Sequence, residues 1–172
     1  MTRCFHNGDT LLKLRRVSPH GFLYYHDAMA FVQSSILINS SPHEVYHLAK
    51  NMERYPEFMP DVEKVTVLER NGNRTLTEWV TSVEGIPVCW KEEDLFDDEA
   101  VVITYKLVEG DLDKFEGAWT FKDKGGATEV TLTVDFDFGM PTLAELLGPI
   151  LKVKVQENSE MMLAGMKREI EG

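Results

Sequence analysis

Apolar and polar residues alternate along most of the chain between residues 31 and 138, which is typical of strands with one buried face. In the last of these segments every second residue from Val130 to Phe138 is apolar, and the intervening residues are charged or carry hydroxyls. Turn residues separate the segments, and Asn71-Gly72 gives the strongest hairpin signal. The pattern predicts a meander of seven strands, at about residues 31–39, 62–70, 76–83, 88–96, 101–108, 115–121 and 128–138.

A short helix is expected directly after the first predicted strand. Ser41 is placed to cap it, Pro42 suits its first turn, and Glu44 completes a capping box. Pro56 and Pro60 then end the helical region and lead the chain into the second strand. The apolar stripe of this helix consists of Val45, Leu48, Ala49 and Met52.

The chain ends in a segment with helical periodicity. We expect a first turn or two from Thr142 to Leu147, a break at Gly148-Pro149, and a restart of the helix at Pro149. Methionine is common in plain core and also in irregular or ligand-filled spaces, so the apolar stripe of this helix fits either a packed core or a pocket wall. The stripe consists of Leu151, Val155, Ser159, Met162, Met166 and Ile170.

Seven strands with one apolar face need a cover, and the C-terminal helix is the only long segment left to provide it. The predicted fold is therefore α+β, with a curved antiparallel sheet wrapped around one long helix and a cavity between them. Residues 29–172 form this domain. Residues 1–28 lack a sustained apolar period and are interpreted as a disordered extension or a mis-assigned start, with a transit peptide as the alternative.

The charge of the chain limits its partners. The net charge is -11 over 172 residues, and residues 1–28 are slightly basic, so the rest is more acidic still. Such a domain repels phosphate backbones and anionic membranes, which argues against nucleic acid as a partner and against stable membrane insertion. Two cysteines, Cys4 and Cys89, make no disulfide framework and have no metal-ligand spacing, so we expect a reducing, cytoplasmic location.

One short motif has the form of a zinc site. Residues 43–47 read His-Glu-x-x-His, in which two histidines on one helix face hold the metal and the glutamate activates water. Here Glu44 already has a capping role, and His43 and His47 point away from the apolar stripe. No third ligand follows at the usual spacing. We therefore expect no metal site and no cofactor.

Two carboxylates on the fourth predicted strand are weak catalytic candidates. Glu92 and Asp94 share a face with Trp90, and their spacing places them roughly 7 Å apart along the strand. If that face lines a closed cavity, one carboxyl has a raised pKa and can act as an acid. The favoured interpretation is that both lie near an open mouth and are solvated, because solvated charges are the default.

From residue 31 to its end the chain resembles the polyketide cyclase and coenzyme Q-binding branch (SRPBCC) of the START-like, helix-grip superfamily. The similar segments, in order, are Ser41-Pro42-x-Glu44-Val45-Tyr46, Tyr55-Pro56-Glu57-Phe58-Met59-Pro60, Glu109-Gly110, Gly117-Ala118-Trp119-Thr120-Phe121 and Thr128-x-Val130. The resemblance implies a seven-stranded antiparallel sheet around a long C-terminal helix, two small helices after the first strand, and a deep apolar pocket.

The resemblance also implies a set of site positions in the aromatase/cyclases that can be compared with this sequence. Aromatase/cyclases of this group resemble one another in a Trp-x-Ser-x-Arg strand, an arginine on the next strand, and a tyrosine after the Pro-Glu turn. Trp90 matches the tryptophan, but Glu92 and Asp94 replace the serine and first arginine, while Leu107 and Val62 replace the other two. The expected ligand-binding residues are Phe58, Trp90, Tyr105, Phe115, Trp119, Phe136, Met162 and Met166.

We predict a protein that binds or carries a lipid-, quinone- or polyketide-like small molecule in an internal cavity. One alternative is an aromatase/cyclase- or dehydratase-like enzyme that acts on a hydrophobic substrate. A second is a protein-binding module, because some relatives resemble ribosome-association proteins. The oligomeric state is not predicted.

Overall fold

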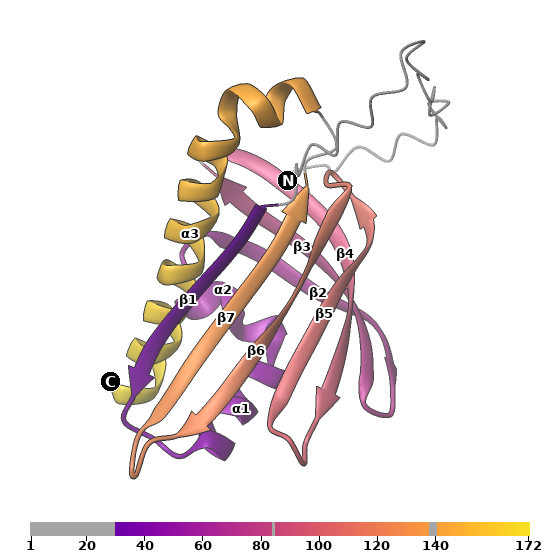
Figure 1. Cartoon of the computed structure of the whole chain (residues 1–172). Helices are drawn as coiled ribbons and strands as arrows, with labels where there is room; N and C mark the ends of the chain where they lie inside the picture. Colours follow the sequence, from indigo (N-terminus) through magenta and orange to yellow (C-terminus); the bar gives the residue numbers. More distant parts are fainter. Residues whose placement is uncertain (1–29, 84, 138–140) are drawn as a thin grey trace, which may run out of the picture.

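The computed structural model describes residues 30–83, 85–137 and 141–172, which form one curved sheet with helices packed against it (Figure 1). All neighbouring strands are antiparallel, in the order β1-β7-β6-β5-β4-β3-β2. Each predicted strand is confirmed, with ends that move by at most two residues. The strands are β1 (Ala30–Ile38), β2 (Val62–Asn71), β3 (Arg74–Val83), β4 (Ile86–Asp97), β5 (Val102–Gly110), β6 (Lys114–Asp123) and β7 (Thr128–Asp137).

The sheet is an open meander to which the first strand is added at one edge, beside β7. Strands β2 to β7 follow one another as hairpins, and β1 pairs with β7 from Ala30 opposite Phe136 to Ile38 opposite Thr128. Burial alternates at every residue of β7, as the apolar pattern predicted. Gly72 has a φ of 61°, which a glycine adopts without strain in the tight turn between β2 and β3.

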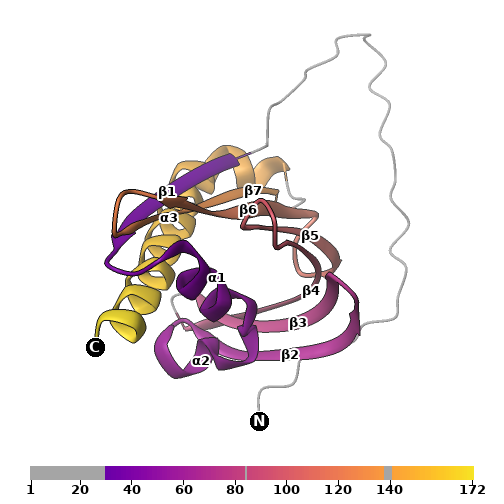
Figure 2. The same ribbon diagram turned by 90° about the horizontal axis from the view of Figure 1, so that it is seen from below.

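Two short helices lie inside the curve of the sheet. They are α1 (Pro42–Lys50) and α2 (Tyr55–Phe58), joined by the 3-10 turn η1 (Met52–Arg54), and Figure 2 shows them next to α3. The capping box of α1 is confirmed, because the Ser41 hydroxyl accepts from the Glu44 N–H and the Glu44 carboxylate accepts from the Ser41 N–H. His43 and His47 are exposed on the opposite side of α1 from the core.

The long helix α3 (Pro141–Glu171) packs along β1 and faces the concave side of the sheet (Figures 1 and 2). The expected break at Gly148-Pro149 is wrong, because the helix continues through both residues. Pro149 lacks the N–H that would bond to the carbonyl of residue 145, so it bends the helix without ending it. Figure 1 shows the first turns of α3 at an angle to the rest. In the described part of the chain, no helix combines the length and apolar character needed to cross a bilayer.

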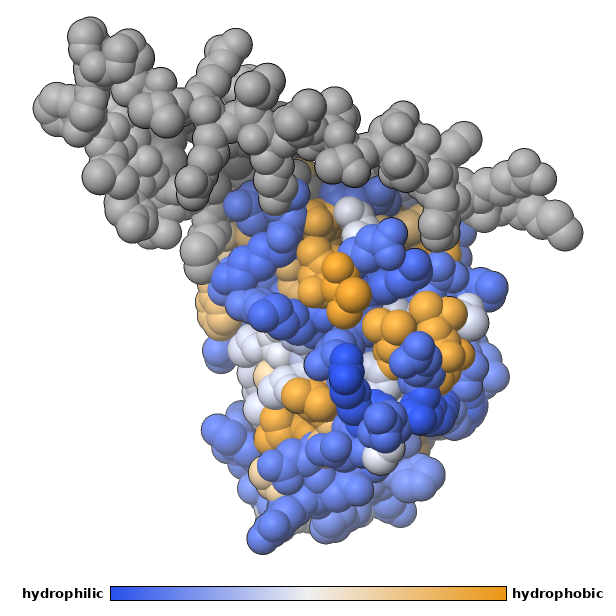
Figure 3. All heavy atoms as spheres, turned by 90° about the vertical axis from the view of Figure 1, so that its right-hand side faces the viewer, coloured by the Kyte–Doolittle hydropathy of each residue, from blue (hydrophilic) through white to orange (hydrophobic). Residues whose placement is uncertain are grey.

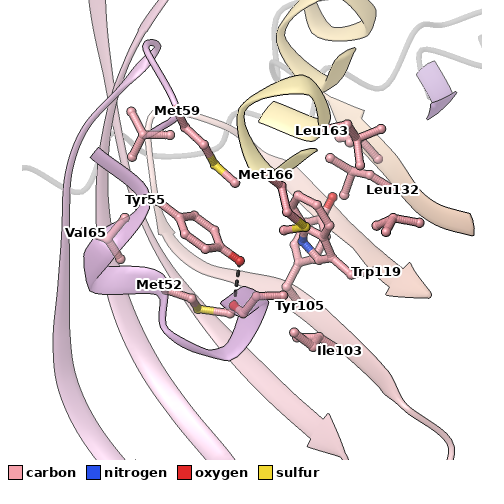
Figure 4. Packing of buried hydrophobic residues seen from close by; sticks show 14 of the residues in the cluster. Met52, Tyr55, Met59, Val65, Ile103, Tyr105, Trp119, Leu132, Leu163 and Met166 are labelled. Atoms are coloured by element: carbon pink, nitrogen blue, oxygen red, sulfur yellow. Dashed lines mark hydrogen bonds between the residues drawn. The ribbon is translucent and has the colours of Figure 1, made fainter. Parts of the chain in front are cut away.

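The core lies where the C-terminal half of α3 meets α1 and α2. Figure 4 shows Tyr55 between Met52 and Met59, with its hydroxyl directed at the Ala49 carbonyl, to which it donates at 2.6 Å. Met59 and Met166 are completely buried. Helix α3 approaches α2 so closely at Gly165 that a Cβ there would lie only 2.3 Å from the carbonyl oxygen of Phe58. This half of the domain is therefore tightly packed.

One expectation from the sequence concerns residues that the structure does not describe, and another disagrees with the structure. The interpretation of residues 1–28 falls outside the described residues and stays a prediction. Cys89 does not carry a free thiol in the structure. Cysteine usage therefore gives no support for the reducing compartment that the sequence suggested.

Candidate functional site

A cavity of about 250 Å³ lies between the concave face of the sheet and the middle of α3. Its wall comes from β3 to β7, from η1 and from α3. The cavity exists because α3 packs closely on the rest only toward its C-terminal end, where Gly165 lets it approach α2. Toward the N-terminal end of α3 the side chains of Leu151, Val155 and Met162 line the cavity.

Aromatic rings make up one side of the cavity. Trp79 and Trp90 are directly opposite each other on β3 and β4, and their rings stack with centroids 5.6 Å apart and planes 6° apart. Phe115 packs against Trp90 at 5.1 Å and against Tyr105 at 5.5 Å. Rings held by one another and by the sheet give a rigid, largely apolar surface for a flat or aliphatic molecule.

Six of the eight residues expected to bind a ligand line this cavity, and two do not. The six come from β4 to β7 and α3, and they are Trp90, Tyr105, Phe115, Trp119, Phe136 and Met162. Met166 is completely buried in the core one turn further along α3. Phe58 packs its ring on Tyr55, with centroids 5.7 Å apart, at the far side of α2. That the six residues contact a ligand stays a prediction.

The sequence reasoning missed twelve residues of the wall. From the sheet and the β5–β6 connection these are Trp79, Thr81, Val88, Leu112, Leu132 and Val134. From η1 and α3 they are Met52, Leu151, Lys154, Val155, Asn158 and Ser159. A signal was present for Trp79, because a tight turn near Gly85 places it opposite Trp90 in the β3–β4 hairpin. On α3, Leu151, Val155 and Ser159 belong to the stripe that the sequence left open between packed core and pocket wall, whereas Lys154 carries no such signal.

Glu92 and Asp94 lie on the cavity side of β4, and the interpretation that they are solvated is wrong. Their exposed fractions are 4% and 0%, and Glu92 lines the cavity. Aromatic side chains of β3, β4 and α2 surround this part of the strand. The sequence could not show this, because the covering ring of Tyr55 comes from a different element, where it packs 5.6 Å from the ring of Trp79.

Neutral donors hold the two carboxyls in place. The indole N–H of Trp90 donates to Glu92 Oε2 at 2.6 Å, and the Thr77 hydroxyl donates to Asp94 Oδ2 at 2.8 Å. The indole N–H of Trp79 donates in turn to the Thr77 hydroxyl at 2.9 Å. In the described part of the chain, no lysine, arginine or histidine is hydrogen-bonded or ion-paired with either carboxyl.

Burial without a cation changes the acidity of both groups. Burial raises the pKa of Glu92 well above its ordinary range, and the neighbouring Asp94 charge raises it further. Burial also raises the pKa of Asp94 to about 7, although the hydrogen bonds from Thr77 and Glu92 oppose the rise. The cavity wall therefore carries a carboxyl whose protonated form is favoured by burial, a group that can donate a hydrogen bond or a proton.

The histidines of α1 do not take part in the carboxyl site. His43 and His47 are exposed, and Glu44 is engaged by the hydroxyls of Ser40 and Ser41, which lower its pKa. Within the described ranges no group of three His, Cys, Asp or Glu side chains is arranged to hold a metal ion.

A curved antiparallel sheet that wraps around one long helix over an apolar cavity is the helix-grip fold, which the similar solved structures share. Residues 38–163 match the family described as polyketide cyclase/dehydrase and lipid transport, and the chain belongs to this family. The resemblance seen in the sequence is therefore confirmed at the level of fold and family.

Individual relatives extend the comparison. The chain is 28% identical to the ribosome association toxin RatA of Vibrio cholerae serotype O1 over 71% of its length and 85% of the relative. TTHA0849 of Thermus thermophilus superimposes with a TM-score of 0.79 at 34% identity, over 81% of this chain and 96% of that one. The Zhui aromatase/cyclase of Streptomyces sp. R1128 has a TM-score of 0.77 at 21% identity, over 83% and 94%, and shows the fold alone.

Proposed function

We propose that the protein binds a small apolar molecule in the cavity between the sheet and α3. The observation that carries the proposal is the cavity itself, about 250 Å³ in volume and walled mainly by aromatic and aliphatic side chains. Native interiors are close-packed, so an internal space of this size in a small domain indicates a ligand-binding site. Membership of a family described by polyketide cyclisation and lipid transport supports the same conclusion.

The wall favours a flat or short-chain ligand of lipid-, quinone- or polyketide-like character. The stacked Trp79 and Trp90 rings offer a planar apolar surface, and Met162 opposite them adapts its shape to the ligand. The ligand contacts that we propose are made by Trp90, Tyr105, Phe115, Trp119, Phe136 and Met162. The cytoplasmic location, the absence of a nucleic-acid partner and the absence of a cofactor stay predictions, and the net charge of -11 supports the second.

A titration with 2-ethylnaphthalene, followed by quenching of intrinsic fluorescence, tests the proposal because all three tryptophans line the cavity. Met162→Trp adds volume where the wall faces open space, so it should abolish binding with little loss of melting temperature. Met161→Trp is the matched control, because residue 161 is 41% exposed on the outer side of α3. It should bind as the wild type does.

The outcomes separate a pocket from an ordinary core. If Met162→Trp unfolds the domain and the wild type binds no apolar probe, the stripe on α3 is packed core and the proposal fails. Native mass spectrometry of the freshly purified protein is a further check, because a carried ligand should appear as one added mass that Met162→Trp lacks.

An enzyme that acts on a hydrophobic ketone is the second candidate, and the buried acid at Glu92 is the observation that favours it. The two arginine positions that aromatase/cyclases share are occupied here by Asp94 and Leu107, so any such enzyme would use acid chemistry in place of cation chemistry. Glu92 and Leu107 are directly paired on β4 and β5. Product formation from a polyketone that Glu92→Gln binds but does not convert would support this candidate.

Ribosome association is the activity named for one set of relatives. The charge and the apolar pattern of the surface argue against this activity for the present chain. The net charge of -11 opposes contact with RNA. On the face shown in Figure 3, apolar side chains form separate clusters among hydrophilic ones and no continuous patch for docking a protein. We expect no co-sedimentation with ribosomal subunits at physiological salt.

A further inference from the structure

The Glu92–Asp94 pair has one property that a simple apolar pocket does not need. Asp94 Oδ1 is buried and has no hydrogen-bond donor among the described residues. The neighbouring carboxyl on the same face of β4 is that of Glu92, and both groups are buried and face no bonded cation among the described residues. Two buried carboxyls side by side without a cation are not both ionised, so one of them is a carboxylic acid. The pair therefore holds a proton.

Only one member of the pair reaches the cavity. Glu92 lines the wall, whereas Asp94 lies behind it and is completely buried. A proton on Glu92 thus has two possible acceptors, the Asp94 carboxylate behind the wall and an acceptor atom on a molecule in the cavity. When Asp94 is itself protonated it no longer competes as an anion, and the Glu92 O–H is available to the ligand.

Several other donors of the wall are already engaged, whereas the indole N–H of Trp119, which also belongs to the wall, has no acceptor among the described residues and is a second donor that the test must separate from Glu92. The hydroxyls of Tyr105 and Ser159 donate to main-chain carbonyls at 2.7 and 2.8 Å. The Trp90 indole donates to Glu92, and the Asn158 amide donates to a carboxylate at 3.0 Å. The Thr81 hydroxyl also lines the cavity. Thr77 is the residue of β3 opposite Glu92, and Thr81 lies four residues from Thr77, or about 13 Å along the strand.

We propose that Glu92 donates a hydrogen bond to a carbonyl-type oxygen of an otherwise apolar ligand, and that protonation of Asp94 releases Glu92 for this role. The inference rests on the proposed binding function and names the ligand class as a hydrophobic ketone or quinone. No bond is made or broken in this step. Binding of such a ligand is coupled to the uptake of a proton by the pair.

The direction of the pH dependence follows from the two carboxyls and the groups that face them. Burial raises the pKa of Asp94 to about 7, so the anion that competes for the Glu92 proton forms as the pH rises through neutrality. Ketone binding should therefore weaken as the pH rises from 6 to 8.5. The facing groups are Tyr55 of α2, Tyr105 of β5 and, at the cavity wall, Lys154 of α3, whereas the nearby Glu93 lies on the other face of β4 and is ion-paired with Arg74.

These neighbours do not titrate in the way needed to mimic the effect. Burial, and then the charges of the two carboxyls, raise the pKa values of Tyr55 and Tyr105 well above their ordinary range, so both stay neutral. Lys154 is ion-paired with Glu157 at 3.0 Å. A change in ketone affinity near neutral pH therefore reports the carboxyl pair.

The test compares two probes that differ by one carbonyl, 2-acetylnaphthalene and 2-ethylnaphthalene, by isothermal titration calorimetry at pH 6 and pH 8.5. The quantity of interest is the ratio of the two Kd values, since the cost of removing the ketone from water is the same in every variant. In the wild type this ratio should favour the ketone about three- to tenfold more at pH 6 than at pH 8.5, the worth of one hydrogen bond. Titrations in buffers of different ionisation enthalpy should show larger proton uptake with the ketone.

Two variants separate the role of Glu92 from its packing. Glu92→Gln keeps an N–H donor but removes the acid, so the ketone should still be favoured, with a smaller dependence on pH. Glu92→Leu removes the donor, so the ratio should shift against the ketone about three- to tenfold at pH 6 and stay equal at both pH values. Should the leucine variant not fold, the glutamine variant alone still decides the question.

Three results would overturn the inference. In the first, both probes bind, but the ratio of their Kd values changes neither with pH nor in either Glu92 variant. Cavity binding then stands, and the ketone contacts another residue, such as Thr81. In the second, 2-(naphthalen-2-yl)ethylamine binds more tightly than the ketone at pH 8.5, which makes the pair a site for cations. In the third, neither probe binds, and then the proposed function itself fails.

Discussion

Replacing Asp94 with asparagine should remove the contribution of Asp94 to the pH dependence of stability between pH 5 and pH 8, and leave that of Glu92. In the folded protein burial raises the pKa of Asp94 to about 7, from an ordinary value of 3.8. A carboxyl with a raised pKa binds more protons in the folded state than in the unfolded state. Its contribution to stability is therefore complete below the unfolded pKa and is lost as the pH rises through the folded pKa. The wild type should be less stable at pH 8 than at pH 5.

The size of the effect follows from the same pKa values. At roughly 1.4 kcal/mol per pKa unit, titration of Asp94 should remove about 2.5 kcal/mol from the free energy of unfolding between pH 5 and pH 8. In Asp94→Asn the amide oxygen can still accept from the Thr77 hydroxyl, and the amide nitrogen can donate to Glu92. The variant should therefore fold, and between pH 5 and pH 8 its free energy of unfolding should fall by about 2.5 kcal/mol less than that of the wild type, while the buried Glu92, whose pKa is also raised, keeps its own pH dependence.

Urea unfolding followed by far-UV circular dichroism, at a series of pH values from 5 to 8, measures both curves. Asp113→Asn is the matched control, because Asp113 is exposed between β5 and β6 and its removal should leave the wild-type pH dependence unchanged. A wild type that is equally stable at pH 5 and pH 8, or an Asp94→Asn curve parallel to it, would refute the reasoning. Either result would mean that Asp94 is solvated or paired with a cation.

Three further predictions concern the rest of the chain. Gly165→Ala should lower the free energy of unfolding by roughly 1–3 kcal/mol, because its Cβ would meet a main-chain oxygen of α2; the exposed Met161→Ala should change it by less than about 0.5 kcal/mol. A chain that begins at Met29 should keep its melting temperature and its affinity for 2-ethylnaphthalene, and a large loss of either would show that residues 1–28 pack on the domain. His47→Ala should leave stability unchanged and elemental analysis should find no bound zinc, so one zinc per chain that the variant lacks would contradict the account.

Local patterns were sufficient to predict the fold. The alternation in residues 128–138 predicted the buried face of β7, and the Ser41–Glu44 capping box predicted the start of α1, because both depend on neighbours in the sequence. The break expected at Gly148-Pro149 is wrong for the opposite reason. Proline removes one helical hydrogen bond, but the continuation of the helix depends on packing that local sequence does not report.

The candidate site was predictable only in part, because it depends on how distant elements meet. Periodicity placed Met162 and Met166 on one stripe of α3, yet the first lines the cavity and the second is core, since the helix approaches α2 at Gly165. Charge alone suggested that Glu92 and Asp94 are solvated. Their burial follows from rings on other elements, above all Trp79 and Tyr55, which no spacing along β4 could reveal.

A crystal structure of the protein soaked with 2-bromonaphthalene tests the central claim most directly, because anomalous scattering locates the bromine without assumptions about the ligand. The account predicts one strong peak inside the cavity, between Trp119 of β6 and Met162 of α3, which disappears in Met162→Trp. A peak on the outer surface instead, for example beside the exposed Phe31 or Leu37 of β1, would contradict it, as would an empty cavity at full soaking concentration.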